Sequence, residues 1–158
     1  MPKLLIFGGT GVLGSAIAEK YQANGYEVTY GVRKISNPDN QFLLPLSEEP
    51  VPELLKGQLF DTVIFAQGAN NNDSVMNHSI DDLNRLFEAN VTFISETSKA
   101  LLLHNLIKHK GKIVILSSFW EQLTRQDKMS YTVTKAAVGG LVRSMAVDLG
   151  NAKGILVN

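Results

Sequence analysis

Short apolar runs alternate with longer segments of helical spacing along this chain of 158 residues. The runs are rich in Val, Ile, Leu and Phe and are bounded by Gly, Pro, Asn or Asp, a pattern typical of buried strands. Strands are predicted at residues 3–7, 27–32, 42–46, 61–66, 111–117 and 154–158. Strands that alternate with helices predict a parallel sheet covered by helices on both faces.

Three segments have the apolar spacing of helices. The first covers about residues 12–24 and is expected to end at Asn24-Gly25, a common C-terminal signal. A long helix is expected to begin after Ser79, whose hydroxyl can cap it, and to continue to about His109. The last helix covers about residues 130–149.

The connection between the second and third strands is unusually short. Residues 33–41 contain Ser-Asn-Pro-Asp-Asn and offer fewer residues than a parallel crossover with a helix normally needs. Either a loop replaces the helix here, or the strand boundaries differ from those predicted.

Length and composition favour a single globular domain, residues 1–158. Fifteen basic and fifteen acidic residues cancel, and no Lys/Arg-rich run occurs, so a nucleic-acid partner is not expected. The chain has no cysteine, which excludes disulfides and thiolate chemistry and fits a reducing compartment. No apolar run is long enough for a membrane span, so we expect a soluble, cytoplasmic protein.

A glycine-rich turn follows the first predicted strand. Its sequence is Gly8-Gly9-Thr10-Gly11-Val12-Leu13-Gly14, and a helix follows it. Such a turn brings backbone N–H groups and a helix N-terminus to a phosphate, and the three spaced glycines allow a tight turn and close packing. The segment predicts a dinucleotide pyrophosphate site, with a purely structural turn as the alternative.

Two basic residues end the second predicted strand. Arg33 and Lys34 stand where a dinucleotide fold places the residues that meet the adenosine ribose, and no carboxylate follows before Asp39. This arrangement favours NADP over NAD, because a basic side chain suits the 2′-phosphate. The alternative is a solvated basic turn.

Three residues in the second half could serve proton and hydride transfer. Tyr131 and Lys135 are one turn apart on the last predicted helix, and Ser118 ends the strand before it. Tyr131 has an ordinary pKa near 10, and the Lys135 ammonium would favour the phenolate and lower that pKa. Ser118 could donate a hydrogen bond to a developing oxyanion. Alternatively, these are ordinary residues of a helix start and a strand end.

Taken together, the motifs resemble the short-chain dehydrogenase/reductase family over nearly the whole chain. They occur in family order: the glycine turn, Asp61-Thr-Val-Ile-Phe-Ala-Gln-Gly68, Asn90, Gly111-Lys-Ile-Val-Ile-Leu-Ser-Ser118, Tyr131-Thr-Val-Thr-Lys135 and Gly154-Ile-Leu-Val-Asn158. The resemblance implies a doubly wound Rossmann fold with strand order 3-2-1-4-5-6. It assigns the acid/base to Tyr131, cofactor binding and tuning of the tyrosine to Lys135, carbonyl orientation to Ser118, and a proton-relay water to Asn90.

The resemblance also implies where the cofactor binds and where this chain departs from the family. The family's Asn-Asn-Ala-Gly after strand four reads Phe65-Ala66-Gln67-Gly68 here, and its last three residues are expected to line the cofactor with Gly8, Thr10, Gly11, Val12, Leu13, Gly14, Arg33, Lys34, Tyr131 and Lys135. The glycine spacing is similar to that of the extended branches, whereas Ser118 and Tyr131 are similar to the compact branch. Family members usually continue past Val157-Asn158 into a substrate lid and a last strand.

The sequence thus favours an NADP-dependent oxidoreductase that interconverts a carbonyl and an alcohol on a small molecule. One alternative is a cofactor-binding but inactive fragment or redox sensor, and a weaker one is a sugar-nucleotide epimerase relative. No histidine pair has metal-ligand spacing, so no metal is expected. A homodimer or homotetramer is expected, because Leu102, Leu106 and Val142 on the two long helices would need cover.

Overall fold

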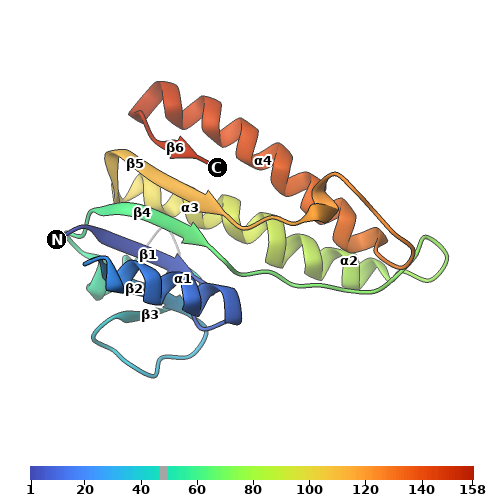
Figure 1. Cartoon of the computed structure of the whole chain (residues 1–158), viewed down its shortest axis with the longest axis horizontal. Helices are drawn as coiled ribbons and strands as arrows, with labels where there is room; N and C mark the ends of the chain where they lie inside the picture. The colour runs from blue at the N-terminus through green and yellow to red at the C-terminus, as the bar shows by residue number, and fades with distance from the viewer. Residues whose placement is uncertain (47–49) are drawn as a thin grey trace.

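A parallel sheet forms the centre of the computed structural model, which describes residues 1–46 and 50–158. Within these residues the sheet has six strands in the order β3-β2-β1-β4-β5-β6. The strands are β1 Lys3–Phe7, β2 Glu27–Val32, β3 Gln41–Leu43, β4 Phe60–Phe65, β5 Ile107–Ile115 and β6 Leu156–Val157. All the arrows in Figure 1 point the same way, so the strands end at one edge of the sheet. The predicted fold and strand order are confirmed.

Helices cover both faces of the sheet (Figure 1). They are α1 Val12–Ala23, α2 Ile80–Phe87, α3 Phe93–Leu103 and α4 Met129–Lys153. A π-helical turn, Glu88–Thr92, joins α2 to α3, and short 3-10 helices lie at Glu53–Leu55 and Phe119–Glu121. Figure 1 shows α2 and α3 as one continuous rod, with α3 along the sheet and α2 extending beyond the carboxyl ends of the strands.

Strands β1, β4 and β5 contribute side chains to two hydrophobic cores, because successive side chains of a strand point to opposite faces of the sheet. Leu4 and Ile6 of β1 pack with Ala18 of α1, whereas Leu5 and Phe7 belong to the larger cluster that contains residues of α3 and α4. Burial on both sides explains why the strands read as continuous apolar runs rather than as alternating ones.

Several predicted boundaries are wrong. The long helix ends at Leu103, not near His109, because Asn105 adopts a left-handed backbone (φ 52°) and Ile107 already begins β5. The third strand covers only residues 41–43. The cap at Ser79 is confirmed: its hydroxyl accepts a hydrogen bond from the Asp82 amide at 3.1 Å. Residues 33–40 form no helix, so a loop does connect β2 to β3.

Leu106 is 3% exposed and belongs to the core of its own chain. The expectation that it needs a partner subunit for cover is therefore wrong. Leu102 and Val142 are partly buried against the same core.

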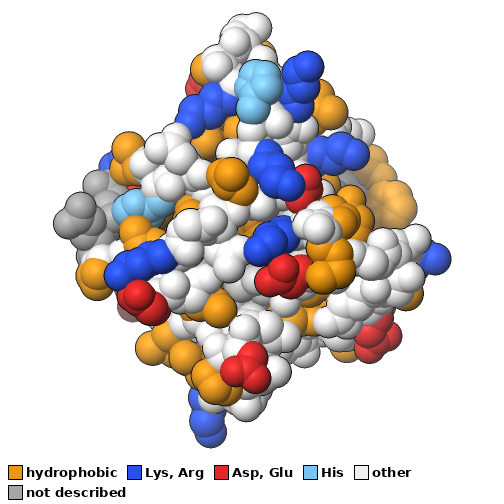
Figure 2. All heavy atoms as spheres, turned by 90° about the vertical axis from the view of Figure 1, so that its left-hand side faces the viewer, with side chains coloured by type: hydrophobic (Ala, Val, Ile, Leu, Met, Phe, Trp, Pro, Cys, Tyr) orange, Lys and Arg blue, Asp and Glu red, His pale blue; other side chains and the backbone are white. Residues whose placement is uncertain are grey.

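The end of the molecule where the strands begin carries mixed charge. Figure 2 shows this end, with basic and acidic side chains interspersed. Two ion pairs join neighbouring strands near their starts, Lys3 with Glu27 at 3.3 Å and Lys108 with Asp61 at 2.8 Å. No helix in the described part of the chain is long and apolar enough to span a membrane.

Candidate active site

The glycine turn connects β1 to α1 at the edge where the strands end. Gly8 has a positive φ of 77°, and the Gly11 amide donates to the Gly8 carbonyl at 3.0 Å, which closes the turn. A side chain at Gly14 would collide with the Gly8 carbonyl oxygen. The helix α1 begins without a side-chain cap and without an acidic residue in its first turn. Its first N–H groups and its dipole are therefore available to an anion.

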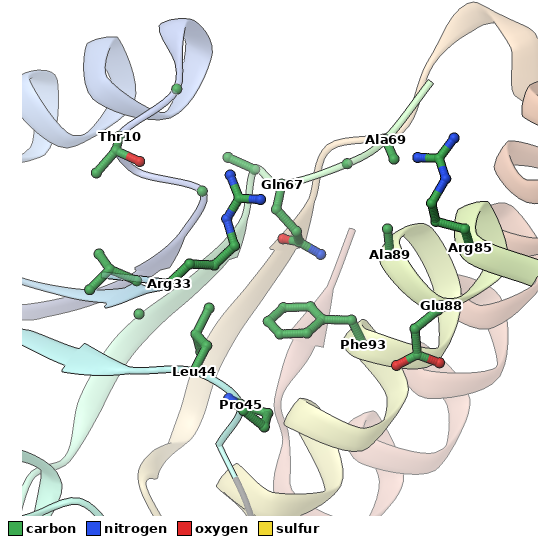
Figure 3. A pocket seen from close by; sticks show the side chains of 16 residues that line it. Thr10, Arg33, Leu44, Pro45, Gln67, Ala69, Arg85, Glu88, Ala89 and Phe93 are labelled. Atoms are coloured by element: carbon green, nitrogen blue, oxygen red, sulfur yellow. The ribbon is translucent and has the colours of Figure 1, made fainter. Parts of the chain in front are cut away.

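A cavity of about 790 Å³ opens beside this turn. It is lined by residues of the strand ends and of the helical segment after Arg85: Gly8, Thr10, Gly11, Gly31, Val32, Arg33, Leu44, Pro45, Ala66, Gln67, Gly68, Ala69, Arg85, Glu88, Ala89 and Phe93. Figure 3 shows the Arg33 guanidinium reaching over the cavity between Thr10 and Gln67. The cavity is large enough for a small-molecule ligand of ordinary size.

The other predicted cofactor residues lie around the cavity in different ways. Lys34 is exposed and does not line it. Val12 and Leu13 are 88% and 66% exposed on the first turn of α1. Their backbone N–H groups, not their side chains, are what this turn offers to a phosphate.

Asn90 connects the cavity to the tyrosine helix. It lies in the π-helical turn, is 1% exposed, and exchanges two hydrogen bonds with the backbone of Ala69, at 2.7 and 2.9 Å. Its Nδ2 also donates to Thr134 Oγ1 at 3.0 Å, and that hydroxyl donates to the Tyr131 carbonyl at 2.9 Å. Both Nδ2 hydrogens are used, so a water held by this side chain would have to bind Oδ1.

Lys135 is buried beside the same wall. It is 5% exposed, and its Nζ donates to the Leu116 carbonyl at 3.1 Å. Burial lowers the pKa of Lys135, and the negative charge of Glu121 opposes that shift. A Cβ added to Gly68 would lie 3.7 Å from Lys135 Nζ and 3.2 Å from Asn90 Oδ1. Gly68, which lines the cavity, therefore also lies next to Asn90 and Lys135, two of the predicted catalytic residues.

Two ammonium groups face the ring of Tyr131. Lys135 Nζ lies 5.7 Å from the ring centroid and Lys128 Nζ lies 5.4 Å from it. Lys128 is itself 5% exposed and donates to Asn70 Oδ1 at 2.9 Å. Cation–π contacts of this kind hold an aromatic ring in place. The sequence reasoning found Lys135 but missed Lys128, which has no motif around it.

Ser118 follows β5 and caps the short helix Phe119–Glu121, which packs against α4. Its Oγ accepts a hydrogen bond from the Trp120 amide at 3.4 Å, which leaves the hydroxyl hydrogen able to donate. Phe119 is 85% exposed, so it does not belong to the core.

The first turn of α4 is capped by a residue from the loop after β4. Asp73 is 4% exposed, its Oδ1 accepts from the Ser130 amide at 2.9 Å, and its carbonyl accepts from the Met129 amide at 3.0 Å. Burial alone would raise the pKa of Asp73, but hydrogen bonds from Ser130 and Asn71 outweigh it and hold the pKa below the usual 3.8. The charged form of Asp73 therefore stabilises the start of the helix that carries Tyr131.

We expect Asp73→Asn to lower the free energy of unfolding at pH 7 by about 1–2 kcal/mol, because charge-assisted hydrogen bonds become neutral ones. A carboxyl whose pKa is lowered on folding stabilises the protein above its unfolded pKa, and that contribution is lost as pH falls through the folded pKa. Urea unfolding at pH 7, 4 and 3 should thus show the wild-type advantage shrinking below pH 4. Asp39→Asn, at an exposed loop position, is the matched control. An advantage that stays constant down to pH 3 would contradict this account.

The cavity also contains residues that the sequence reasoning missed. Leu44, Pro45 and Phe93 form apolar walls, and Arg85 lies at the rim, 3.1 Å from Asp82. Nothing in their local sequence separates them from ordinary core or helix-surface residues. Among the described residues, no group of three or more His, Asp or Glu side chains could hold a metal ion.

The chain is similar in sequence to known proteins. The family model described as enoyl-(acyl carrier protein) reductase matches residues 55–158. The chain is 25% identical to the 3-oxoacyl-[acyl-carrier-protein] reductase FabG of Salmonella typhimurium, over 98% of this chain and 69% of that protein.

Solved structures show the same fold. A short-chain dehydrogenase/reductase from Serratia marcescens superposes with a TM-score of 0.82 at 21% identity, over 99% of this chain and 76% of that one. ElxO with NADP bound gives a TM-score of 0.82 at 24% identity, over 99% and 71%. With the family model matching more than half of its residues, the chain belongs to the short-chain dehydrogenase/reductase family of oxidoreductases.

Proposed function

We propose that this protein is an NADP-dependent oxidoreductase that interconverts a carbonyl and an alcohol on a small molecule, with Tyr131 as acid/base. The observation that carries the proposal is the position of Gly68, which lies between the cavity beside the glycine turn and the residues around Tyr131. An anion-binding turn with Arg33 over the cavity lies on one side of it, and Asn90, Lys135 and Tyr131 lie on the other.

The cofactor half fits a dinucleotide. The uncapped start of α1 suits a pyrophosphate, and the Arg33 guanidinium suits a ribose 2′-phosphate with two parallel hydrogen bonds. ElxO, which has the same fold, binds NADP. When bound, NADPH supplies the hydride for the carbonyl carbon.

The protein's own residues would then handle the proton. The Tyr131 hydroxyl donates its proton to the substrate oxygen, and in the reverse direction the phenolate takes it from the alcohol. Ser118 donates a hydrogen bond to the same oxygen as negative charge develops on it. The Lys135 ammonium faces the tyrosine ring and stabilises negative charge on the phenol oxygen.

The name of the matching family model raises one neighbouring possibility, reduction of a conjugated carbon–carbon double bond. Assays with NADPH should therefore include a panel of aldehydes and ketones beside conjugated enoyl thioesters. Turnover of the carbonyl compounds supports the proposal, and turnover of the enoyl compounds alone contradicts it. Tight NADPH binding without turnover of either would favour an inactive, cofactor-binding protein.

We expect NADPH to bind at least about tenfold more tightly than NADH, because a charge-assisted bond from Arg33 to the 2′-phosphate contributes about 1.5–3 kcal/mol. Arg33→Ala should remove this preference and leave NADH binding nearly unchanged. Fluorescence titration of both reduced cofactors measures it. Arg125→Ala, which removes an arginine lying 5.8 Å over the Trp120 ring, is the control and should keep the preference. Equal wild-type affinities for the two cofactors would refute the NADP assignment.

A further inference from the structure

The side chain of Gln67 is a polar group of the cavity wall that the proposed reaction does not use. Gln67 follows β4 and lines the cavity. Its Oε1 and Nε2 are both buried, and neither has a hydrogen-bond partner among the described residues. An amide buried without partners is unfavourable, so this conformation gains little from its polar atoms. A ligand that offers a donor and an acceptor side by side would correct that deficit.

The surroundings of Gln67 suit a flat ring. Figure 3 shows its amide directed toward Phe93, whose ring points toward Leu44, with Pro45 nearby. Apolar and aromatic walls of this kind bind planar heteroaromatic groups, with a few polar groups that fix their orientation. Gln67 is a polar group of that sort beside these apolar residues.

The position of this part of the cavity identifies which end of the cofactor would reach it. Arg33 follows β2 and Leu44 follows β3, so both lie on the β2–β3 side of the glycine turn, away from the β5–β6 side. Ser118 follows β5, and Lys135 contacts the Leu116 carbonyl just after β5. Both therefore lie on the side of β4 that faces away from β1. In the proposed NADP site the nicotinamide would therefore lie near Lys135 and Ser118, and the base at the other end of the dinucleotide would lie among Leu44, Pro45 and Phe93.

We propose that the carboxamide of Gln67 selects adenine as the base of the bound dinucleotide, an inference that rests on the proposed NADP site. Oε1 accepts a hydrogen bond from the 6-amino group, and Nε2 donates to the adjacent ring nitrogen. A carboxamide makes this pair of bonds to adenine in other settings. Because both amide atoms are covered in the free protein, this pairing requires the Gln67 side chain to rotate as the ligand enters.

Binding of NADP⁺ and of 1,N6-etheno-NADP⁺ to wild type and to Gln67→Met tests this role. The etheno bridge removes the amino hydrogens of adenine but leaves the phosphates, riboses and nicotinamide unchanged. Calorimetry should show wild type preferring NADP⁺ by about tenfold, the discrimination expected of a paired amide contact. The preference should vanish in Gln67→Met, because only NADP⁺ loses affinity. Gln22→Met, on the exposed face of α1, is the control and should keep the preference.

Thermal unfolding separates this role from a structural one. Methionine has nearly the same length as glutamine and removes two unpartnered polar atoms from the interior, so Gln67→Met should unfold at the wild-type temperature or above it. Equal loss of affinity for both ligands in Gln67→Met would place the contact at a ribose and overturn the adenine assignment. Unchanged affinity for both would also overturn it. Failure of wild type to bind NADP⁺ would instead refute the proposed function, and this inference with it.

Discussion

Tyr131→Phe should reduce NADPH-dependent carbonyl reduction by a factor on the order of 10²–10⁴ while the affinity for NADPH stays within about twofold. The substitution removes only the hydroxyl. The phenylalanine ring keeps its contacts with the two ammonium groups, which lie 5.4 and 5.7 Å from the ring centroid of Tyr131. The proton donor is needed chiefly as charge develops on the substrate oxygen, so the loss belongs in kcat rather than in cofactor binding.

Initial rates with the best substrate of the carbonyl panel measure kcat, and NADPH titrations measure the cofactor affinity. Tyr26→Phe is the matched control, since Tyr26 packs edge-on against Tyr21 at 4.8 Å beside α1, far from the reaction. Its rate should equal that of wild type. Rapid reduction by Tyr131→Phe would overturn the assignment of the acid/base.

Lys135→Met should impair cofactor binding and turnover together, in contrast to the tyrosine variant. The ammonium of Lys135 faces the tyrosine ring and lies beside Gly68 on the cofactor wall. We expect NADPH affinity to fall about tenfold, as for one charge-assisted hydrogen bond, and kcat to fall by a further factor of about 10² or more.

The stability of this variant distinguishes a functional role from a structural one. Burial lowers the pKa of Lys135, so folding disfavours its charged form and the unfolded chain binds the proton more strongly. At neutral pH the native state therefore bears a cost that Lys135→Met removes, and the Tm should be near or above the wild-type value. Lys153→Met, at the exposed end of the same helix, should leave both binding and turnover unchanged. A large drop in Tm with intact kcat would contradict the assigned role.

The sequence predicted the order of the strands, and the bounds of β1 and β2, for a physical reason. Strands buried on both faces appear as apolar runs such as Leu4-Leu5-Ile6-Phe7, which few other structures require. The end of α3 was harder to place, since Leu106 and Ile107 continue the apolar pattern although they belong to a turn and to β5. Asn105 was the available signal, because asparagine tolerates the left-handed conformation that ends helices.

The candidate site residues also differ in how well the sequence alone predicts them. Gly8, Tyr131 and Lys135 stand in motifs whose spacing is set by a turn or by one helical repeat, so they could be found by spacing. The partners of Asn90 lie 21 and 44 residues away in sequence, and the cavity position of Phe93 depends on how a helix packs. Such relations exist only after the chain has folded, and no local pattern contains them.

The hydrogen bonds by which Asp73 caps α4 affect the order in which parts of the chain fold. Asp73 and Ser130 are 57 residues apart in sequence, so the entropy of closing that loop must be overcome before the contact forms. The far end of α4 can pack against β6 through contacts that are local in sequence, whereas the turn around Ser130 gains its cap only when the loop after β4 has docked. The end of the helix that carries Tyr131 would thus be among the last parts of the chain to become ordered.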